Sequence, residues 1–235
     1  MKIKAVIFDL DGTIASFNID YRTIRAEVRG FLIRTGIPAS TLSVSESIFE
    51  MLKKAEIFMK NNGQPENAIT RICHEALGIA EKYELEAAKY TSPFPGVTET
   101  LKTLKEMGLK LGLCTINSEK SVEYILKRFK IKSFFDAVTP RDNVKNVKPN
   151  TEHLEATLKA LGVEPRNAAV VGDGANDMKC ARDLGAMAVG IPTGVSDAKE
   201  LISAGASYMV TSITDLPILI GYINKSTREQ QNENL

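Results

Sequence analysis

A pair of aspartates at the end of an apolar run constrains the fold of this chain more than any other feature. Residues 3–8 are rich in β-branched and aromatic side chains, and Asp9 and Asp11 follow them, with a glycine directly after Asp11. This pattern predicts a buried parallel strand that ends in a turn. Two carboxylates there are costly unless a cation or a reacting group compensates their charge. Because Asp-Gly is also common in ordinary loops, the rest of the chain decides between the two interpretations.

The size and composition of the chain favour a soluble protein with a substantial core. Its 235 residues, 43% of them hydrophobic, suffice for one large domain or two unequal ones. The 30 basic and 29 acidic side chains nearly balance, so no nucleic-acid partner is expected. No membrane partner is expected either, since no apolar segment approaches the roughly 18 to 20 residues that cross a bilayer, and the first run is too short for a secretory leader. Three scattered cysteines favour free thiols over a disulfide or zinc site, and hence a cytoplasmic location.

Four helices are predicted after the first strand, with no convincing strand among them. Their apolar side chains recur every three or four residues, and glycine, asparagine or proline separates one stripe from the next. The predicted helices cover residues 21–32, 44–59, 65–78 and 80–90. We therefore expect residues 15–92 to form a small four-helix bundle.

From residue 97 onward the pattern alternates between helix and strand. Helices are predicted at residues 97–107, 118–129, 149–161 and 177–184, and strands at residues 109–114, 135–138, 168–171, 187–190 and 208–210. Such alternation is typical of an α/β fold, with a parallel sheet and helices on both of its faces. Because the N-terminal strand belongs to this sheet, residues 1–14 and 93–224 are expected to form one core domain, into which the bundle is inserted. Residues 225–235 are predicted to be a polar tail that frays into solvent.

Carboxylates follow two of the predicted strands. Ligands of open α/β sheets bind beyond the carboxyl ends of the strands. Asp9 and Asp11 stand at that end of the first strand, and Asp173 and Asp177 follow the fourth. Such a cluster suits a hard cation that prefers oxygen ligands, and Mg²⁺ is the metal best suited to phosphate chemistry.

Two further polar residues fall at the same edge of the predicted sheet. Thr115 follows the second strand, and Lys148 precedes a proline at the start of a helix. A hydroxyl donor and a cation together can hold the oxygens of a phosphoryl group. Each residue taken alone has an ordinary structural interpretation, as a helix cap or a solvated helix start. Their order along the chain favours a shared site.

These segments, taken in order, resemble the four motifs of the haloacid dehalogenase-like hydrolases. They are Asp9-Leu10-Asp11-Gly12-Thr13, the strand ending at Thr115, Lys148-Pro149, and Gly172-Asp173-Gly174-Ala175-Asn176-Asp177. The first and last are the specific ones, and the resemblance extends to about Gly194. An all-helical insertion after the first motif is similar to the phosphoglycolate phosphatase-like branch. The resemblance implies a Rossmann-like core with strand order 5-4-1-2-3, a mobile α-helical cap, and Mg²⁺-dependent phosphoryl transfer through an aspartyl phosphate.

The resemblance also implies a role for each aspartate. Asp9 would be the nucleophile, and Asp11 would be the general acid and then the general base. Mg²⁺ would bind Asp9, Asp173 and the backbone carbonyl of Asp11. Asp177 would hold a water on the metal or the motif lysine.

The implied phosphate ligands include one departure from the family pattern. Thr115 and Lys148 match the motifs directly. Many relatives carry Asn or Ser immediately after the threonine, whereas here Ile116 takes that place and Asn117 follows. We therefore expect the polar contact with phosphate to shift to Asn117 or to be lost.

This set of residues predicts a phosphomonoesterase that acts on a small phosphorylated metabolite resembling 2-phosphoglycolate. A phosphosugar mutase of the same architecture would use the same two aspartates but would protect its phosphoaspartate from water. A non-enzymatic regulatory or binding module is the third alternative, although it would have no reason to keep all six polar residues. The presence of Asp11 argues against a dehalogenase, because cleavage of a carbon–halogen bond needs no acid there.

The identity of the substrate and the oligomeric state cannot be deduced from these patterns. In a capped hydrolase, specificity comes from the cap and its linkers, which carry no readable code. Residues at the start of the cap are the candidates to touch the leaving group: Phe17, Asn18, Tyr21 and Arg22.

Overall fold

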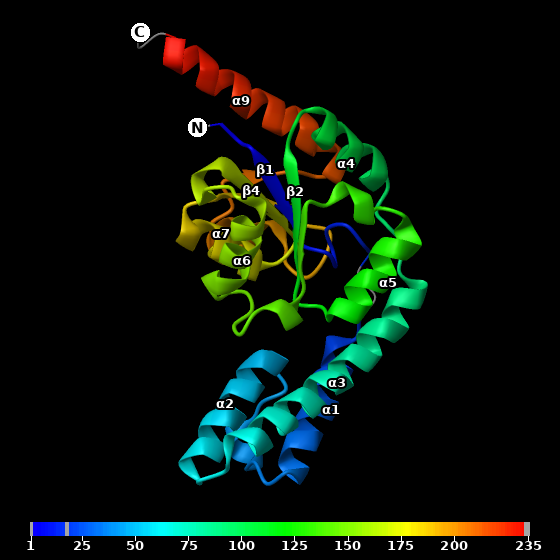
Figure 1. The fold of residues 1–235 in the computed structure, drawn as a ribbon, viewed down its shortest axis with the longest axis vertical. Helices are drawn as coiled ribbons and strands as arrows, with labels where there is room; N and C mark the ends of the chain where they lie inside the picture. Colours follow the sequence, from blue (N-terminus) through cyan, green and yellow to red (C-terminus); the bar gives the residue numbers. More distant parts are fainter. Residues whose placement is uncertain (1, 17–18, 233–235) are drawn as a thin grey trace. The chain divides into compact units, whose positions relative to one another are not determined.

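The computed structural model describes residues 2–16 and 19–232, with side chains described up to residue 226 (Figure 1). Contacts within the chain divide it into two compact units. The larger unit comprises residues 1–17 and 91–235 and contains a β-sheet, and the smaller unit comprises residues 18–90. Among its described residues, the smaller unit is helical.

The sheet of the larger unit is parallel, with the strand order β3-β2-β1-β4-β5-β6. The strands are β1 (Ala5–Phe8), β2 (Lys110–Cys114), β3 (Ala137–Thr139), β4 (Ala168–Gly172), β5 (Met187–Gly190) and β6 (Tyr208–Met209). The predicted order 5-4-1-2-3 is present, and β6 extends it at one edge. The central strands are buried almost throughout, which explains their uninterrupted apolar sequences. The predicted α/β fold class is confirmed.

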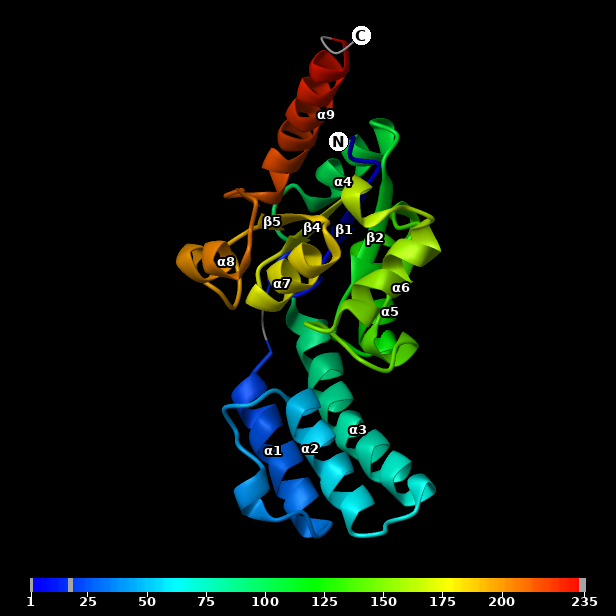
Figure 2. The same cartoon turned by 90° about the vertical axis from the view of Figure 1, so that its left-hand side faces the viewer.

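Helices cover both faces of this sheet (Figure 2). On one face lie α6 (Thr151–Leu161) and α7 (Ala175–Leu184), with α8 (Ala198–Ala204) beside α7. On the other face lies α4 (Val97–Glu106), and α9 (Leu216–Asn232) packs against it. The remaining helices of this unit are α5 (Glu119–Phe129) and the short 3₁₀ segments Lys132–Phe134, Arg141–Asn143, Pro165–Asn167 and Ile213–Asp215.

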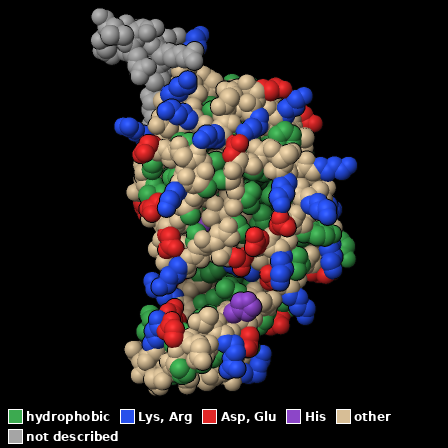
Figure 3. Space-filling model, viewed as in Figure 1, with side chains coloured by type: hydrophobic (Ala, Val, Ile, Leu, Met, Phe, Trp, Pro, Cys, Tyr) green, Lys and Arg blue, Asp and Glu red, His purple; other side chains and the backbone are tan. Residues whose placement is uncertain are grey.

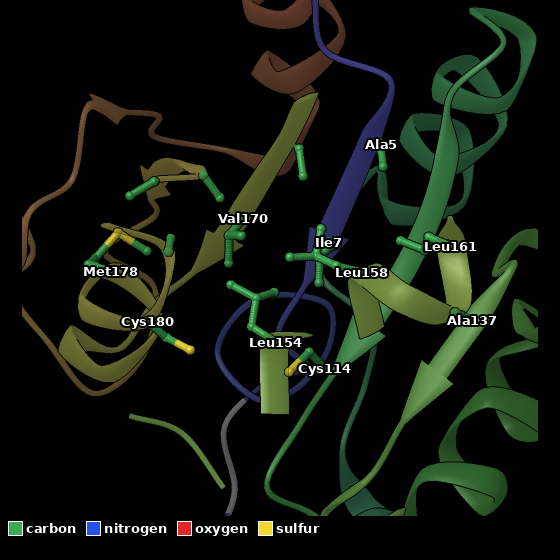
Figure 4. Close-up of a cluster of buried hydrophobic side chains, with 14 of the residues drawn as sticks. Ala5, Ile7, Cys114, Ala137, Leu154, Leu158, Leu161, Val170, Met178 and Cys180 are labelled. Atoms are coloured by element: carbon green, nitrogen blue, oxygen red, sulfur yellow. The ribbon is translucent and has the colours of Figure 1, made fainter. Parts of the chain in front are cut away.

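A buried cluster joins the sheet to α6 and α7 (Figure 4). Leu154 and Leu158 of α6 lie beside Ile7 of β1 and Val170 of β4. Residues two apart on a strand share a face, so this cluster takes the odd-numbered positions of β1 and leaves Phe8 to the opposite face. The ring of Phe8 there meets that of Phe135 edge to face, with centroids 6.4 Å apart. Packing on both faces holds β1 firmly, and with it the two aspartates that follow.

The smaller unit packs its helices through apolar stripes. Its helices are α1 (Tyr21–Arg34), α2 (Ile48–Asn61) and α3 (Glu66–Tyr90), with a 3₁₀ turn at Ala39–Thr41. Asp20 caps the N-terminus of α1 by accepting two backbone N–H groups, and Ser47 forms a capping box with Glu50 at the start of α2. The hydrophobic core of this unit includes Ile24, Val28 and Leu32 of α1 and Met51, Ala55 and Met59 of α2.

The prediction of two separate helices before and after Gly78 was wrong. Helix α3 runs continuously through Gly78 for 25 residues. Its buried positions Ile69, Ala76, Ala80 and Glu84 stay in helical register across the glycine. A glycine within a helix costs about 1 kcal/mol relative to alanine. Packing of α3 against α1 and α2 offsets that cost here, so the bundle has one long helix in place of two shorter ones.

The polar tail predicted for residues 225–235 is helical as far as Asn232, because α9 continues into it. The buried side chains Leu216, Ile220 and Ile223 anchor the first half of this helix. Asn224 ties it to the segment before β1, since its Oδ1 accepts from the Ile3 N–H at 2.7 Å and its Nδ2 donates to the Ile3 carbonyl at 3.1 Å. The Arg, Glu and Gln residues that follow have high helix propensity and propagate the helix.

The surface carries both signs of charge, as the nearly equal numbers of basic and acidic residues lead one to expect. On the face shown in Figure 3, lysine and arginine side chains alternate with aspartate and glutamate. Within the described residues, no helix combines the length and the apolar character needed to cross a bilayer.

Candidate active site

A buried lysine bridges two of the predicted aspartates at the carboxyl edge of the sheet. The Nζ of Lys148 lies 2.8 Å from Oδ1 of Asp9 and 2.5 Å from Oδ1 of Asp177, and it also donates to the carbonyl oxygen of Cys114 at 2.8 Å. The lysine side chain is only 6% exposed. Three oxygen acceptors around one ammonium group satisfy its three donors, which is the condition for burying such a charge.

Asp173 joins these residues to form a cluster of carboxylates. One carboxylate oxygen from each of Asp9, Asp173 and Asp177 lies within 4.8 Å of the others. The N–H of Val195 donates to Oδ2 of Asp173 at 2.8 Å, and the hydroxyl of Thr13 lies 3.4 Å from Oδ1. The structure thus brings together the residues that follow β1 and β4.

Glycines of the motifs leave room for these carboxylates. Gly12 has a φ of +75°, and a Cβ built on it would overlap the carboxylate of Asp173. A Cβ on Gly172 would likewise overlap Asp177. The glycines beside the aspartates are therefore needed for close approach as well as for turning the chain.

Asp11 lies in a second group with two residues of the β2 loop. The Nδ2 of Asn117 donates to Oδ2 of Asp11 at 2.8 Å, and the backbone N–H of Asn117 donates to Oγ1 of Thr115 at 3.3 Å. Asn117 and Thr115 are each 1% exposed. The carboxylate of Asp11 stands outside the three-carboxylate cluster, which fits the expectation that Asp11 would contribute its backbone carbonyl to a metal. The roles of Thr115, Asn117 and Lys148 toward phosphate stay predictions.

The cluster carries more negative charge than its lysine can balance. Burial, followed by the charges of Asp9 and Asp177, raises the pKa of Asp173 to about 8. Burial also raises the pKa of Asp177 to about 6, although Lys148 opposes this shift. Desolvation lowers the pKa of Lys148, but the charges of Asp177 and Asp9 outweigh it and hold that pKa well above its usual value. Shifts of this kind mark groups arranged for charge compensation or chemistry.

The donor set of the cluster fits Mg²⁺. Three carboxylates and one ammonium group leave two negative charges uncompensated when all are ionised, which matches one divalent cation. All the donors are oxygens, as a hard cation prefers. Both oxygens of Asp177 are engaged, one by the charged Lys148 and one by the Gly174 N–H at 3.3 Å. Asp173 contacts only neutral donors, the Val195 N–H and the Thr13 hydroxyl, and Lys148 contacts only one oxygen of Asp9. Asp9 and Asp173 are therefore better suited than Asp177 to direct coordination.

Sequence reasoning missed the residues that hold these loops in place. His153 lies with Nε2 3.0 Å from the Thr139 carbonyl and Nδ1 3.4 Å from the backbone N of Lys148. Burial lowers the pKa of His153 to about 4, so the ring is neutral near pH 7 and can accept from Lys148 while donating to Thr139. Arg141 donates through Nη1 to the Ile116 carbonyl at 3.0 Å and so supports the Thr115–Asn117 turn. Neither residue carries a recognisable sequence motif.

The loop after β5 also reaches the site, through Thr193 and Val195. A signal for it did exist in the sequence. The rule that ligands gather at carboxyl ends of parallel strands, applied to the strand ending at Gly190, points to this loop.

Four residues at the start of the predicted cap were candidates to touch the leaving group. Tyr21 and Arg22 lie in the first turn of α1, and Phe17 and Asn18 lie outside the described residues.

Comparisons with known proteins identify the class to which this fold belongs. The profile of the haloacid dehalogenase-like hydrolases matches residues 6–191. The chain belongs to this family, and the resemblance stated from its motifs is confirmed. It is an enzyme of the hydrolase class, with phosphatases among its relatives.

Relatives of similar length carry two different names. A protein named pyrophosphatase PpaX from Halalkalibacterium halodurans is 27% identical over 224 residues, which cover 94% of this chain and 98% of the relative. A protein named phosphoglycolate phosphatase from Chromobacterium violaceum is also 27% identical, over 91% of this chain and 95% of its own.

Solved structures share the fold. A predicted phosphatase from Clostridium acetobutylicum superposes with a TM-score of 0.64 at 23% identity, over 94% of this chain and 99% of its own. A β-phosphoglucomutase from Clostridium difficile gives a TM-score of 0.65 at 21% identity, over 97% and 98% of the two chains. Because both identities are low, these likenesses show the architecture alone.

Proposed function

We propose that this chain is a Mg²⁺-dependent phosphomonoesterase that hydrolyses a small phosphorylated metabolite through an aspartyl phosphate on Asp9. The observation that carries the proposal is the pairing of Asp9 with Lys148 at 2.8 Å, two residues before an Asp11 that Asn117 holds at 2.8 Å. A nucleophile and a general acid are thereby fixed on one turn by separate partners. The family of the chain supports this assignment.

Asp9 is suited to be the nucleophile. Lys148 occupies its Oδ1, and no described residue donates a hydrogen bond to its Oδ2. That second oxygen is available to attack phosphorus in line, forming the bond of the phosphoaspartate as the ester P–O bond breaks. The electron pair of the broken bond leaves on the substrate oxygen.

Asp11 is suited to manage the proton in both steps. In the first step it gives a proton to the departing oxygen, which leaves as an alcohol. In the second step its carboxylate accepts a proton from the water that attacks the phosphoaspartate. The bond from phosphorus to Asp9 then breaks, which releases inorganic phosphate and restores the Asp9 carboxylate. Asn117 keeps Asp11 in one orientation through both steps.

The remaining polar residues would hold the charge of the phosphoryl group. Lys148 already balances part of the negative charge around Asp9, and Thr115 offers a hydroxyl at the end of β2. Asp9, Asp173 and the backbone carbonyl of Asp11 would bind Mg²⁺. When bound, this cation would supply the positive charge that lets an anionic nucleophile approach an anionic phosphate.

The names of the relatives and the helical unit suggest which substrates to test. Relatives named phosphoglycolate phosphatase and pyrophosphatase resemble this chain to a similar degree. Among phosphomonoesters 2-phosphoglycolate therefore leads the candidates, and inorganic pyrophosphate, a phosphoric anhydride, is the candidate outside that class. We propose that the helical unit of residues 18–90 acts as the cap that chooses between them. Release of inorganic phosphate from a panel of phosphorylated metabolites, with both compounds included, tests the substrate class. Conversion of a sugar phosphate to its isomer without phosphate release would favour the mutase alternative instead.

Asp11→Asn should separate substrates by their leaving groups. An alkoxide leaves poorly without a proton, so kcat/KM for an alkyl phosphate should fall by about 10²- to 10⁴-fold. p-Nitrophenolate leaves without much protonation, so the loss on p-nitrophenyl phosphate should be much smaller. Steady-state rates on both substrates measure the difference, with the exposed Asp183→Asn as control. Equal losses on the two substrates would remove Asp11 from the role of acid.

Removal of divalent metal should abolish turnover, and Mg²⁺ should restore it. Ca²⁺ takes more oxygen ligands at longer distances than Mg²⁺ does. Ca²⁺ would engage both oxygens of Asp9, so we expect it to inhibit rather than to replace Mg²⁺. Rates of phosphate release after chelation, and after addition of each cation, check this expectation. Full activity in the chelated protein, or with Ca²⁺ alone, would contradict the metal site.

A further inference from the structure

The loop that follows β5, residues 193–195, contacts two turns of the site without belonging to any of the four motifs. The hydroxyl of Thr193 donates to the carbonyl oxygen of Gly12, directly after Asp11. The N–H of Val195 donates to Oδ2 of Asp173 at 2.8 Å. The next residue, Ser196, donates its N–H to the Asp173 carbonyl at 3.2 Å. The loop therefore joins the turn after β1 to the turn after β4.

Gly194, at the centre of this loop, leaves no room for a side chain. A Cβ built on it would overlap Oδ2 of Asp173 and would lie 2.9 Å from the Cα of Gly12. The φ of Gly194 is not in the left-handed region, so alanine there would be excluded by contact and not by backbone strain. The loop thus packs directly onto Asp173, one of the two carboxylates proposed to coordinate the metal.

We propose that residues 193–195 form a fifth element of the active site, which clamps the Asp173 carboxylate against the Gly12 turn and thereby sets the affinity for Mg²⁺. The inference rests on the proposed function in one respect, the assignment of Asp173 as a metal ligand. Thr193 and Gly194 are positioning residues in this scheme, because they act through Asp173 and Gly12. Partners behind a metal ligand commonly contribute 10- to 100-fold to metal affinity.

Gly194→Ala should weaken Mg²⁺ binding by about tenfold or more, because the new methyl group displaces Asp173. Isothermal titration of the metal-free protein with Mg²⁺ measures this loss without reference to activity. Gly221→Ala is the matched control, since no neighbouring heavy atom lies within 4 Å of a Cβ built there. The control should bind Mg²⁺ as tightly as the wild type.

Thr193→Val provides a milder test that should preserve the fold. It keeps the branched shape and removes the hydroxyl that donates to Gly12, so Mg²⁺ binding should weaken about threefold or more. Thr193→Ser retains the hydroxyl and should bind normally. High Mg²⁺ concentrations should return kcat of Thr193→Val to nearly the wild-type value, which damage to the fold would not allow. If Gly194→Ala does not fold, this pair decides the question.

The outcomes separate this inference from the proposed function. Mg²⁺ binding that weakens in Gly194→Ala and Thr193→Val, but not in Gly221→Ala and Thr193→Ser, supports the clamp. Wild-type affinity in both loop variants, together with metal-dependent phosphatase activity, overturns the clamp alone. A wild-type protein that does not bind Mg²⁺ overturns the metal site of the proposed function and the clamp together.

Discussion

Asp9→Asn is expected to lower turnover by about 10³-fold or more and to leave the fold intact. The amide has nearly the same shape as the carboxylate but is a far poorer nucleophile, so no phosphoaspartate forms. Lys148 keeps its contacts with Asp177 and with the Cys114 carbonyl, so its charge remains paired in the variant. The loss of one carboxylate also relieves repulsion with Asp173, whose pKa is raised first by burial and then by the charge of Asp9.

Two measurements on the purified variant check this expectation. Phosphate release should fall by about 10³-fold or more on every substrate that the wild type accepts. The free energy of unfolding should change by no more than about 1–2 kcal/mol. Deamidation of the new asparagine would restore aspartate, so the mass of the protein must be verified before and after the assay. Comparable turnover in a verified Asp9→Asn protein would remove Asp9 from its role.

Lys148→Met should lower both kcat and the free energy of unfolding. It removes the ammonium that lies 2.8 Å from Asp9 and 2.5 Å from Asp177. The buried carboxylate of Asp177 and the partly buried carboxylate of Asp9 are left without their cation. Breaking a buried pair by removing one partner typically costs about 3–5 kcal/mol. The phosphoryl group also loses a positive charge in the transition state, so kcat should fall by about 10²- to 10³-fold. Lys102→Met, on an exposed face of α4, is the matched control.

The pH dependence of this instability should identify its cause. The pKa of Asp177 is raised to about 6 in the wild type, and losing Lys148 raises it further. A carboxyl group with a raised pKa in the folded state costs stability as the pH rises through that pKa, because the folded protein must then ionise it. Metal-free Lys148→Met should therefore be closer to the wild type at pH 5 than at pH 8. Chemical denaturation at both pH values measures the effect.

A double variant distinguishes charge from packing in this result. Asp177→Asn added to Lys148→Met removes one of the two stranded carboxylates, so stability at pH 8 should recover while turnover does not. If Lys148→Met is equally unstable at both pH values and the second substitution does not help, lost packing explains the instability and the electrostatic account is wrong.

Patterns that depend on one strand or one strand end were readable in the sequence. Apolar runs bounded by turns predicted the central strands, because both faces of β1 and β4 are buried. The edge rule for parallel sheets placed Asp9, Asp173 and Lys148 together, and the structure brings them into contact or near contact. The strand order itself came from the family resemblance and not from periodicity.

Features that depend on packing between distant segments were not readable. Helix α3 continues through the exposed Gly78 because Ala76 and Ala80, on either side of it, are buried in the core of the smaller unit. The contact of Asn117 with Asp11 joins residues that are remote in sequence. His153 lies close to Lys148 in sequence, but nothing in its local pattern indicates that it contacts the backbone of that lysine. The edge rule points to the loop at residues 193–195, but its contact with Asp173 was not readable, because it depends on where two turns meet in space.

Trapping of the phosphoenzyme tests the central claim most directly. The protein is mixed with Mg²⁺ and a substrate found by the phosphate-release screen, quenched in acid, and treated with borohydride, which reduces an acyl phosphate to the alcohol. Mass spectrometry of the peptides then locates the reduced residue. We predict homoserine in place of aspartate at position 9, in the wild type only after exposure to substrate and never in Asp9→Asn. Turnover with a modification at another residue, or with no trapped intermediate across the whole time course, would contradict the account.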